Sequence, residues 1–246
     1  MKIILLPAIA ILAGALPARA DWIAGRDLIA NELPDGPQEL LNPNAAVPEW
    51  SYGYRSALAG TAFTPFVAAN HTNAAGSSPL VQGWTVNDRT AAVNTGAVPV
   101  IFNFGTGPLS QLNPGEMILH PSLVLEYTLV RWTAPAAGSY ALSASWQDID
   151  LHGGDGASGN VVVNGTPIFA QSFGNGGQTS TTQTVTLSAG DLVDFALGAN
   201  GDYLFDATRF NAVIVPEPSA LALLLGALLP VFCGRRKSAE KSRSRC

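Results

Sequence analysis

The densest group of polar side chains in the sequence is the segment Asp148-Ile149-Asp150-Leu151-His152-Gly153-Gly154-Asp155-Gly156. Alternating carboxylates separated by glycines can wrap side-chain and main-chain oxygens around a calcium ion. Asp148, Asp150 and Asp155 are therefore candidate ligands of a structural calcium, with a solvated acidic turn as the alternative. The spacing differs from a helix-loop-helix calcium loop, because no bidentate glutamate closes the segment.

A smaller acidic pair, Asp202 and Asp206, flanks Tyr203, and the preceding Ala-Asn-Gly-Asp stretch favours an exposed loop. Exposed aromatic rings stack on sugar rings, so Tyr203 is a candidate sugar contact. Trp50 and Tyr52 alternate along one expected strand and share one of its faces. That face belongs either to the hydrophobic core or, together with Tyr203, to a glycan-binding platform.

The signals for catalysis are weak. The sequence contains no nucleophile-elbow, phosphate-loop, dinucleotide or zinc-protease motif. Glu116 and Glu126 are an acid pair of the kind that glycoside cleavage needs, with carboxyl groups about 5–9.5 Å apart. Glu126 follows two apolar residues in an expected strand, so it can equally face solvent. We expect a non-catalytic protein with no cofactor beyond the calcium, and keep a glycoside hydrolase as the last alternative.

The charge of the chain argues against nucleic acid as a partner. Between Asp21 and Val215 the sequence has sixteen acidic residues, five arginines and no lysine, a net charge of −11. Binding to nucleic acid depends on neutralising phosphates with basic side chains, which this segment lacks. Both cysteines, Cys233 and Cys246, lie near the C-terminus, so the segment has no disulfide.

Residues 21–214 consist of short apolar or alternating runs cut by Gly, Pro and Asn turns, which predicts an all-β fold. The run Thr182–Leu187 alternates with a period of two, as in a half-buried strand. Asn164-Gly165, between two apolar runs, predicts a tight hairpin. The spacing of the runs predicts a single jelly-roll-like β-sandwich over 21–214.

Other elements are expected from the same patterns. Residues Ala24 to Glu32 offer a weak helix, Phe205 to Ile214 a last strand, and Ala68 to Pro79 and Asn87 to Ala97 two polar loops.

The N-terminus, residues 1–20, predicts a signal peptide. Lys2 supplies a positive start, Ile3 to Leu16 an apolar segment, and Ala18-Arg19-Ala20 a small-x-small site. Signal peptidase would cleave after Ala20 and leave Asp21 as the first residue of the exported protein.

The C-terminus predicts a weak membrane anchor. The unbroken apolar run Ala220–Cys233 has 14 residues, which corresponds to a helix of ~21 Å against a bilayer core of ~30 Å. We expect a membrane helix over about 219–233. Arg235 and Arg236 would stay on the cytoplasmic side, followed by a basic cytoplasmic tail at 239–246.

This tail resembles the PEP-CTERM sorting signal of Gram-negative bacteria. The likeness rests on Pro216-Glu217-Pro218, the short apolar run and the basic cluster, which together cover residues 215–238. It implies that an exosortase-type membrane protease recognises Pro216, Glu217 and Pro218 and removes the C-terminal segment beyond them. The protein would cross the inner membrane, be anchored transiently by the C-terminal helix until this cleavage, and then reach the cell surface or extracellular matrix. A plain tail anchor is the alternative.

The body of the chain also resembles secreted bacterial proteins that carry such tails and whose sandwich domain is similar to carbohydrate-binding modules. The residues involved include Trp50-Ser51-Tyr52-Gly53-Tyr54, Trp132-Thr133-Ala134-Pro135 and Val163-Asn164-Gly165. We predict a structural role in an exopolysaccharide matrix. The alternative is a carbohydrate-binding module that retains matrix polysaccharide.

Overall fold

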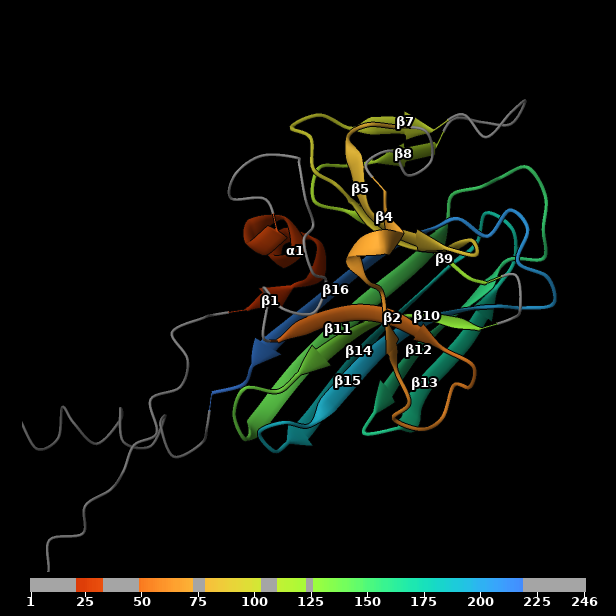
Figure 1. Cartoon of the computed structure of the whole chain (residues 1–246). Coiled ribbons are helices and arrows are strands. Elements are labelled where there is room, and N and C mark those ends of the chain that lie inside the picture. The colour runs from red at the N-terminus through yellow and green to blue at the C-terminus, as the bar shows by residue number, and fades with distance from the viewer. Residues whose placement is uncertain (1–20, 33–48, 73–77, 103–109, 123–125, 219–246) are drawn as a thin grey trace, which may run out of the picture.

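The computed structural model describes residues 21–32, 49–72, 78–102, 110–122 and 126–218 (Figure 1). The predicted signal peptide with Ala18 and Ala20, the predicted helix at 219–233, Arg235, Arg236 and the tail 239–246 lie outside these residues. Within the described ranges, no helix is long and apolar enough to cross a membrane.

The described elements are one α-helix, one short 3₁₀ helix and sixteen strands. In chain order they are β1 (Trp22–Ile23), α1 (Ala24–Glu32), β2 (Trp50–Arg55), β3 (Thr64–Pro65), η1 (Ala68–Asn70), β4 (His71–Thr72), β5 (Val81–Val86), β6 (Arg89–Asn94), β7 (Val100–Phe102), β8 (Ser110–Leu112), β9 (Met117–His120), β10 (Tyr127–Thr133), β11 (Gly138–Asp148), β12 (Ala157–Val163), β13 (Thr166–Phe173), β14 (Gln178–Leu187), β15 (Leu192–Ala199) and β16 (Thr208–Pro216).

The strands form two antiparallel sheets that pack face to face, and the predicted all-β sandwich is confirmed (Figure 1). Sheet A has the order β14-β11-β16-β9-β6-β5-β4, with β1 also paired to β16. Sheet B has the order β13-β12-β15-β10-β2-β3, and β7 and β8 form a separate small sheet. From β10 to β16 the chain passes from one sheet to the other at every step except the β12–β13 hairpin. This alternation is typical of jelly-roll sandwiches.

Tight turns set the register of two hairpins. Asn164 and Gly165 join β12 to β13 with φ values of 48° and 82°, as the sequence predicted. Asn87 and Asp88 join β5 to β6 in the same way, with φ values of 48° and 65°. The predicted loop at 87–97 is therefore wrong, because it contains β6. Alanine-rich β6 has little strand propensity, but it is paired on both sides, with β5 and β9.

The last strand begins later than predicted. Phe205 has a positive φ of 65° and belongs to the loop before β16, which starts at Thr208 and continues to Pro216. The pairing of β16 with β11 continues one residue beyond the end of β16, because the N–H of Glu217 donates to the carbonyl of Ser139 at 2.8 Å.

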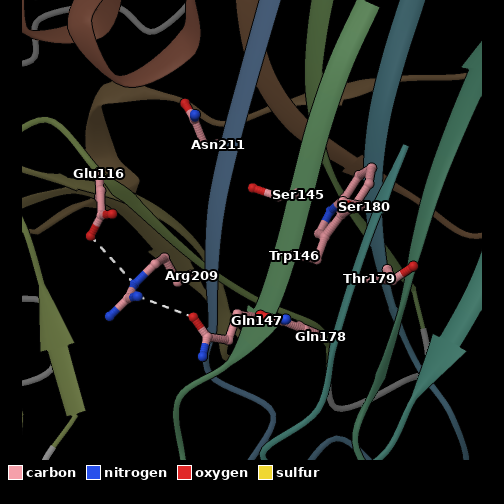
Figure 2. A pocket seen from close by; sticks show the side chains of 9 residues that line it. All are labelled: Glu116, Ser145, Trp146, Gln147, Gln178, Thr179, Ser180, Arg209 and Asn211. Carbon is pink, nitrogen blue, oxygen red and sulfur yellow. Dashed lines mark hydrogen bonds and ion pairs between the residues drawn. The ribbon is translucent and has the colours of Figure 1, made fainter. Parts of the chain in front are cut away.

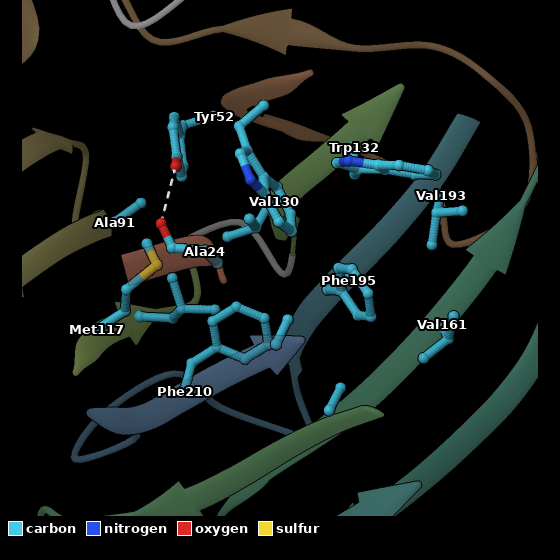
Figure 3. Close-up of a cluster of buried hydrophobic side chains, with 14 of the residues drawn as sticks. Ala24, Tyr52, Ala91, Met117, Val130, Trp132, Val161, Val193, Phe195 and Phe210 are labelled. Carbon is cyan, nitrogen blue, oxygen red and sulfur yellow. Dashed lines mark hydrogen bonds between the residues drawn. The ribbon is translucent and has the colours of Figure 1, made fainter. Parts of the chain in front are cut away.

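Aromatic side chains fill the space between the sheets (Figure 3). All five tryptophans are buried, and the rings of Trp22 and Trp132 meet edge to face with centroids 5.2 Å apart. Helix α1 closes one side of this core, where the hydroxyl of Tyr52 donates to the carbonyl of Ala24 at 3.4 Å. This burial leaves polar side chains for the outer faces and the loops.

Candidate functional site: a polar pocket on sheet A and an acidic loop edge

A pocket of about 560 Å³ lies on the outer face of sheet A, over β14, β11 and β16 (Figure 2). Its floor is set by strand register, because Ser145 of β11 lies opposite Ser180 of β14 and Asn211 of β16. One step along, Gln147 lies opposite Gln178 and Arg209. The pocket is lined by Glu116, Ser145, Trp146, Gln147, Gln178, Thr179, Ser180, Arg209 and Asn211.

A second depression of about 220 Å³ lies on the same face and shares Ser145, Ser180 and Asn211 with the pocket. It is lined further by Ser143 and Thr182, which are opposite each other in the β11–β14 register. From Gln147 to Ser143 the strand rises ~13 Å at about 3.3 Å per residue. The polar surface is therefore longer than one sugar unit.

The charges at the wall of the pocket neutralise each other. Nε of Arg209 lies 3.3 Å from Oε2 of Glu116, and Nη1 donates to Oε1 of Gln147 at 3.0 Å (Figure 2). The same guanidinium also donates to the main-chain carbonyl of Gln111. With this pair compensated, the other polar groups of the pocket are neutral hydroxyls and amides, which both donate and accept hydrogen bonds.

Aromatic stacking contributes little to this pocket. Trp146 is fully buried below it, with its ring against Phe210 at a centroid distance of 5.6 Å. A ligand would therefore be held by hydrogen bonds to the sheet face.

The predicted platform of Trp50 and Tyr52 is wrong, because both side chains lie in the core. Nε1 of Trp50 donates to Oδ2 of Asp27 at 3.0 Å, and the ring of Tyr52 stacks on Trp84 with centroids 5.2 Å apart. Tyr203 is half-buried in the loop before β16, where its ring packs edge to face on His120 with centroids 6.3 Å apart. The three aromatic residues thus form no common surface.

The acidic segment after β11 is organised mainly by its own backbone. Oδ1 of Asp148 accepts the N–H of Asp150 at 2.9 Å, and Oδ2 accepts the N–H of Gly176 at 2.9 Å. Oδ1 of Asp150 lies 2.9 Å from Nδ1 of His152. Burial raises the pKa of Asp148 above its ordinary value, against the effect of these hydrogen bonds.

The predicted calcium ligands Asp148, Asp150 and Asp155 are not assembled as a set. In the part of the chain that the structure describes, no three His, Cys, Asp or Glu side chains are placed to hold a metal ion. Asp148 acts as a cap for two loops instead.

The structure does bring the two acidic groups of the sequence together. Asp206 is fully buried, and neither of its carboxylate oxygens has a hydrogen-bond partner. Burial raises its pKa to about 7, with further contributions from the charges of Asp155, Asp148, Asp202 and Asp150. The sequence showed these residues only as two separate acidic segments.

The glutamates of the hydrolase alternative lie at opposite ends of β6. The carbonyl of Glu116 accepts the N–H of Asn94, the last residue of β6, whereas Glu126 pairs with Arg89, the first. The strand between these two contacts spans ~16 Å, whereas glycoside cleavage uses carboxyl groups about 5–9.5 Å apart. Each carboxylate is also paired with a different arginine.

Of the predicted sorting residues, Pro216, Glu217 and Pro218 are described. Pro216 is the last residue of β16, and the side chains of Glu217 and Pro218 are exposed. The motif thus begins at the last residue of the last strand of the sandwich.

No protein-family model matches the chain, and no curated protein is similar to it. Among solved structures, a family 35 carbohydrate-binding module from Clostridium thermocellum has 17% identity and a TM-score of 0.29, covering 55% of this chain and 97% of that one. The CBM35 of Cellvibrio japonicus Abf62 has 16% identity and a TM-score of 0.31, covering 52% and 94%. CBM51 from Clostridium perfringens GH95, in complex with methyl-galactose, has 11% identity and a TM-score of 0.32, covering 51% and 92%.

At these TM-scores the similarity assigns neither a family nor a function to the chain. Its sandwich architecture follows from its own strand pairing, and its function has to be argued from its own surface.

Proposed function

We propose that this chain is an exported, non-catalytic protein that binds neutral polysaccharide through the pocket on sheet A. The observation that carries the proposal is the lining of this pocket, in which Ser145, Gln178, Ser180 and Asn211 converge from three adjacent strands. Hydroxyl and amide groups match the alternating donors and acceptors of sugar hydroxyls. A volume of about 560 Å³ lies within the usual range for small-ligand sites, about 300–1,000 Å³.

The surrounding charge favours a neutral polymer. The Arg209–Glu116 pair leaves the wall of the pocket without net charge, while the segment from Asp21 to Val215 is strongly acidic. An anionic polysaccharide would be repelled by this field. The sequence predicted a structural role in an exopolysaccharide matrix. This role is compatible with the proposal if the polymer bound in the pocket is the matrix polysaccharide.

Affinity gel electrophoresis of the purified chain against neutral and anionic polysaccharides tests the proposal. Asn211→Ala and Gln178→Ala should each weaken binding about tenfold, because each removes hydrogen bonds that together contribute about 1.4 kcal/mol. Thr186→Ala is the matched control, since Thr186 is exposed on β14 but outside both depressions. Unchanged migration of both pocket variants in a gel that retards the wild type would place the binding site elsewhere.

The proposal includes sorting through Pro216, Glu217 and Pro218, with Arg235 and Arg236 fixing the orientation in the membrane. It is supported by the position of the motif at the end of β16, where cleavage after Pro218 would leave the sandwich whole. Intact mass of the protein from culture, with and without the exosortase-type protease, tests this part. A chain from Asp21 to about Pro218 is expected only with the protease, and a tail retained in both strains would indicate a plain anchor.

A further inference from the structure

The sandwich has two long edge strands. Among the described strands, β14 is the last strand of sheet A and β13 the last strand of sheet B, and each is paired on one side only. They have ten and eight residues, whereas the strands at the opposite ends of the two sheets, β4 and β3, have two residues each. An edge strand presents a row of unpaired N–H and C=O groups to which a strand of another chain can add. The two long edges are therefore the places where this fold can take up a further strand.

Of these two edges, β13 is protected against pairing and β14 is not. Pro167 lies within β13, and the register of β12 with β13 shifts beside this proline. A proline lacks the N–H group that a new strand would bind, and a shifted register interrupts the edge. Strand β14 contains no proline, and it pairs with β11 over all ten of its residues without a register shift. Its open edge is therefore long and regular.

The same side of the molecule is free of charge. The sequence from Gly156 to Gly190, which contains β12, β13 and β14, has no charged side chain, although the segment from Asp21 to Val215 has a net charge of −11. Charged side chains, lysine above all, are a usual protection of an exposed edge. Two copies of this acidic chain repel each other when they approach through their charged surfaces. An approach through β14 avoids this repulsion, which favours a second copy as the partner of the edge.

The side chains of β14 are complementary to those of a second, antiparallel β14. Every second residue is exposed on the outer face of sheet A, namely Gln178, Ser180, Thr182, Thr184 and Thr186. Antiparallel registers centred on Thr182 or on Gln183 overlap the two strands most fully and keep this outer face continuous. Both registers place threonine and serine side chains of one copy opposite threonine and serine of the other. Such hydroxyl pairs stabilise neighbouring strands.

We infer that the chain forms a dimer in which β14 of one copy pairs antiparallel with β14 of the second copy, so that sheet A continues from one copy into the other. Main-chain hydrogen bonds along the edge would hold the two copies, and no charged group would lose its water. The inference is independent of the proposed polysaccharide binding, because the pairing of two edges needs no ligand. Its consequence is that the two polar pockets, which lie over β14, β11 and β16, would share one continuous face.

The test is sedimentation velocity of the purified chain at rising concentration, without polysaccharide. We expect a reversible dimer at micromolar concentrations, since an interface of one strand pair is small. Thr182→Lys should raise the dissociation constant about tenfold or more, because both registers bring the two ammonium groups close together at the edge. Thr85→Lys is the matched control. It makes the same change at an exposed threonine of β5, in the same sheet but away from β14, and should leave the dissociation constant unchanged.

A charge swap shows whether the two β14 strands meet each other. Thr182→Glu should dimerise as weakly as Thr182→Lys, whereas an equimolar mixture of the two variants should recover the dimer, because opposite charges then face each other. Hydrogen exchange gives a second measurement, since the amides of β14 should exchange more slowly at high concentration in the wild type but not in Thr182→Lys. A wild type that stays monomeric throughout would overturn the inference and leave the edge to a strand of another protein. A dimer of equal stability in Thr182→Lys would also overturn it and place the interface elsewhere.

Discussion

Arg131 and Asp194 face each other across β10 and β15 in a two-point ion pair on the outer side of sheet B. Nε of Arg131 lies 2.6 Å from Oδ1 of Asp194, and Nη2 lies 3.0 Å from Oδ2. Arg55 of β2 reaches the same carboxylate with Nη1 at 2.9 Å. All three side chains are almost completely buried, because the segment between β2 and β3 covers them.

The two arginines also hold that covering segment. Arg55 donates to the carbonyls of Leu58 and Gly60, and Arg131 donates to the carbonyl of Thr61 at 3.2 Å. Burial lowers the pKa of Arg55, against the raising effect of Asp194. The carboxylate therefore compensates two buried cations, and the segment closes the outer face of sheet B at this place.

We predict that Asp194→Asn lowers the free energy of unfolding by about 3–5 kcal/mol, since it leaves two buried guanidinium groups without a counter-charge. Urea unfolding followed by tryptophan fluorescence measures this. Asp191→Asn, in the exposed turn three residues before, should cost less than about 1 kcal/mol. Equal effects of the two substitutions would contradict a specific role of the buried cluster.

A second prediction separates the core position of Trp50 from a platform position. Trp50→Phe should lower the free energy of unfolding by about 1–3 kcal/mol, because it removes buried volume and the hydrogen bond to Asp27. Polysaccharide affinity of the folded variant should not change. Lost affinity with wild-type stability, measured by the same urea unfolding and gel retardation, would restore the platform hypothesis.

The sequence could predict local structure where one or two residues decide it. Asn164-Gly165 specifies a hairpin because both positions need positive φ. The polar–apolar alternation of Thr182–Leu187 corresponds to the alternating exposure of side chains along β14. The pattern of Trp50 and Tyr52 predicted that they share a face, yet a period of two does not say which face another sheet covers.

The candidate sites depend on pairing between distant strands, which no local pattern encodes. Ser145, Ser180 and Asn211 meet only through the register of β11 with β14 and β16. Ser and Asn are common in turns and on surfaces, so their types gave no signal. The burial of Asp206 arises in the same way, since its neighbours include residues of a loop far earlier in the chain.

The third prediction concerns the support of the pocket floor from below. In Gly159→Ala the new methyl group would lie 2.6 Å from the ring of Trp146, so we expect a loss of about 1–3 kcal/mol from overpacking. Polysaccharide binding should weaken as well, because Trp146 lies below the pocket. Gly174→Ala, with no atom within 4 Å of the added methyl group, should change stability by less than about 0.5 kcal/mol. Chemical unfolding of both variants compares them directly.

A fourth prediction concerns His120, whose Nδ1 lies 2.8 Å from the carbonyl of Pro121. A carbonyl only accepts, so Nδ1 carries the proton of the neutral ring. Burial lowers the pKa of His120 below its ordinary value of 6.5. As the pH falls below about 6.5, the unfolded chain therefore takes up a proton that the folded chain does not, and stability is lost. Above this pH the contribution of His120 is fully present.

This loss should appear as a difference between the wild type and His120→Gln, which does not titrate. Asp148 and Asp206 have raised pKa values and act in the opposite direction, so the slope of the wild type alone does not isolate His120. Urea unfolding at intervals from about pH 7.5 to about pH 5.5, in chelator, gives the two curves. We expect the wild type to lose stability relative to His120→Gln as the pH falls, by at most about 1.4 kcal/mol per pH unit because one proton is involved. If the free energy of unfolding depended on pH in the same way for the wild type and His120→Gln, His120 would have the same pKa in the folded and unfolded chains. The ring would then be exposed to solvent despite its packing against Tyr203.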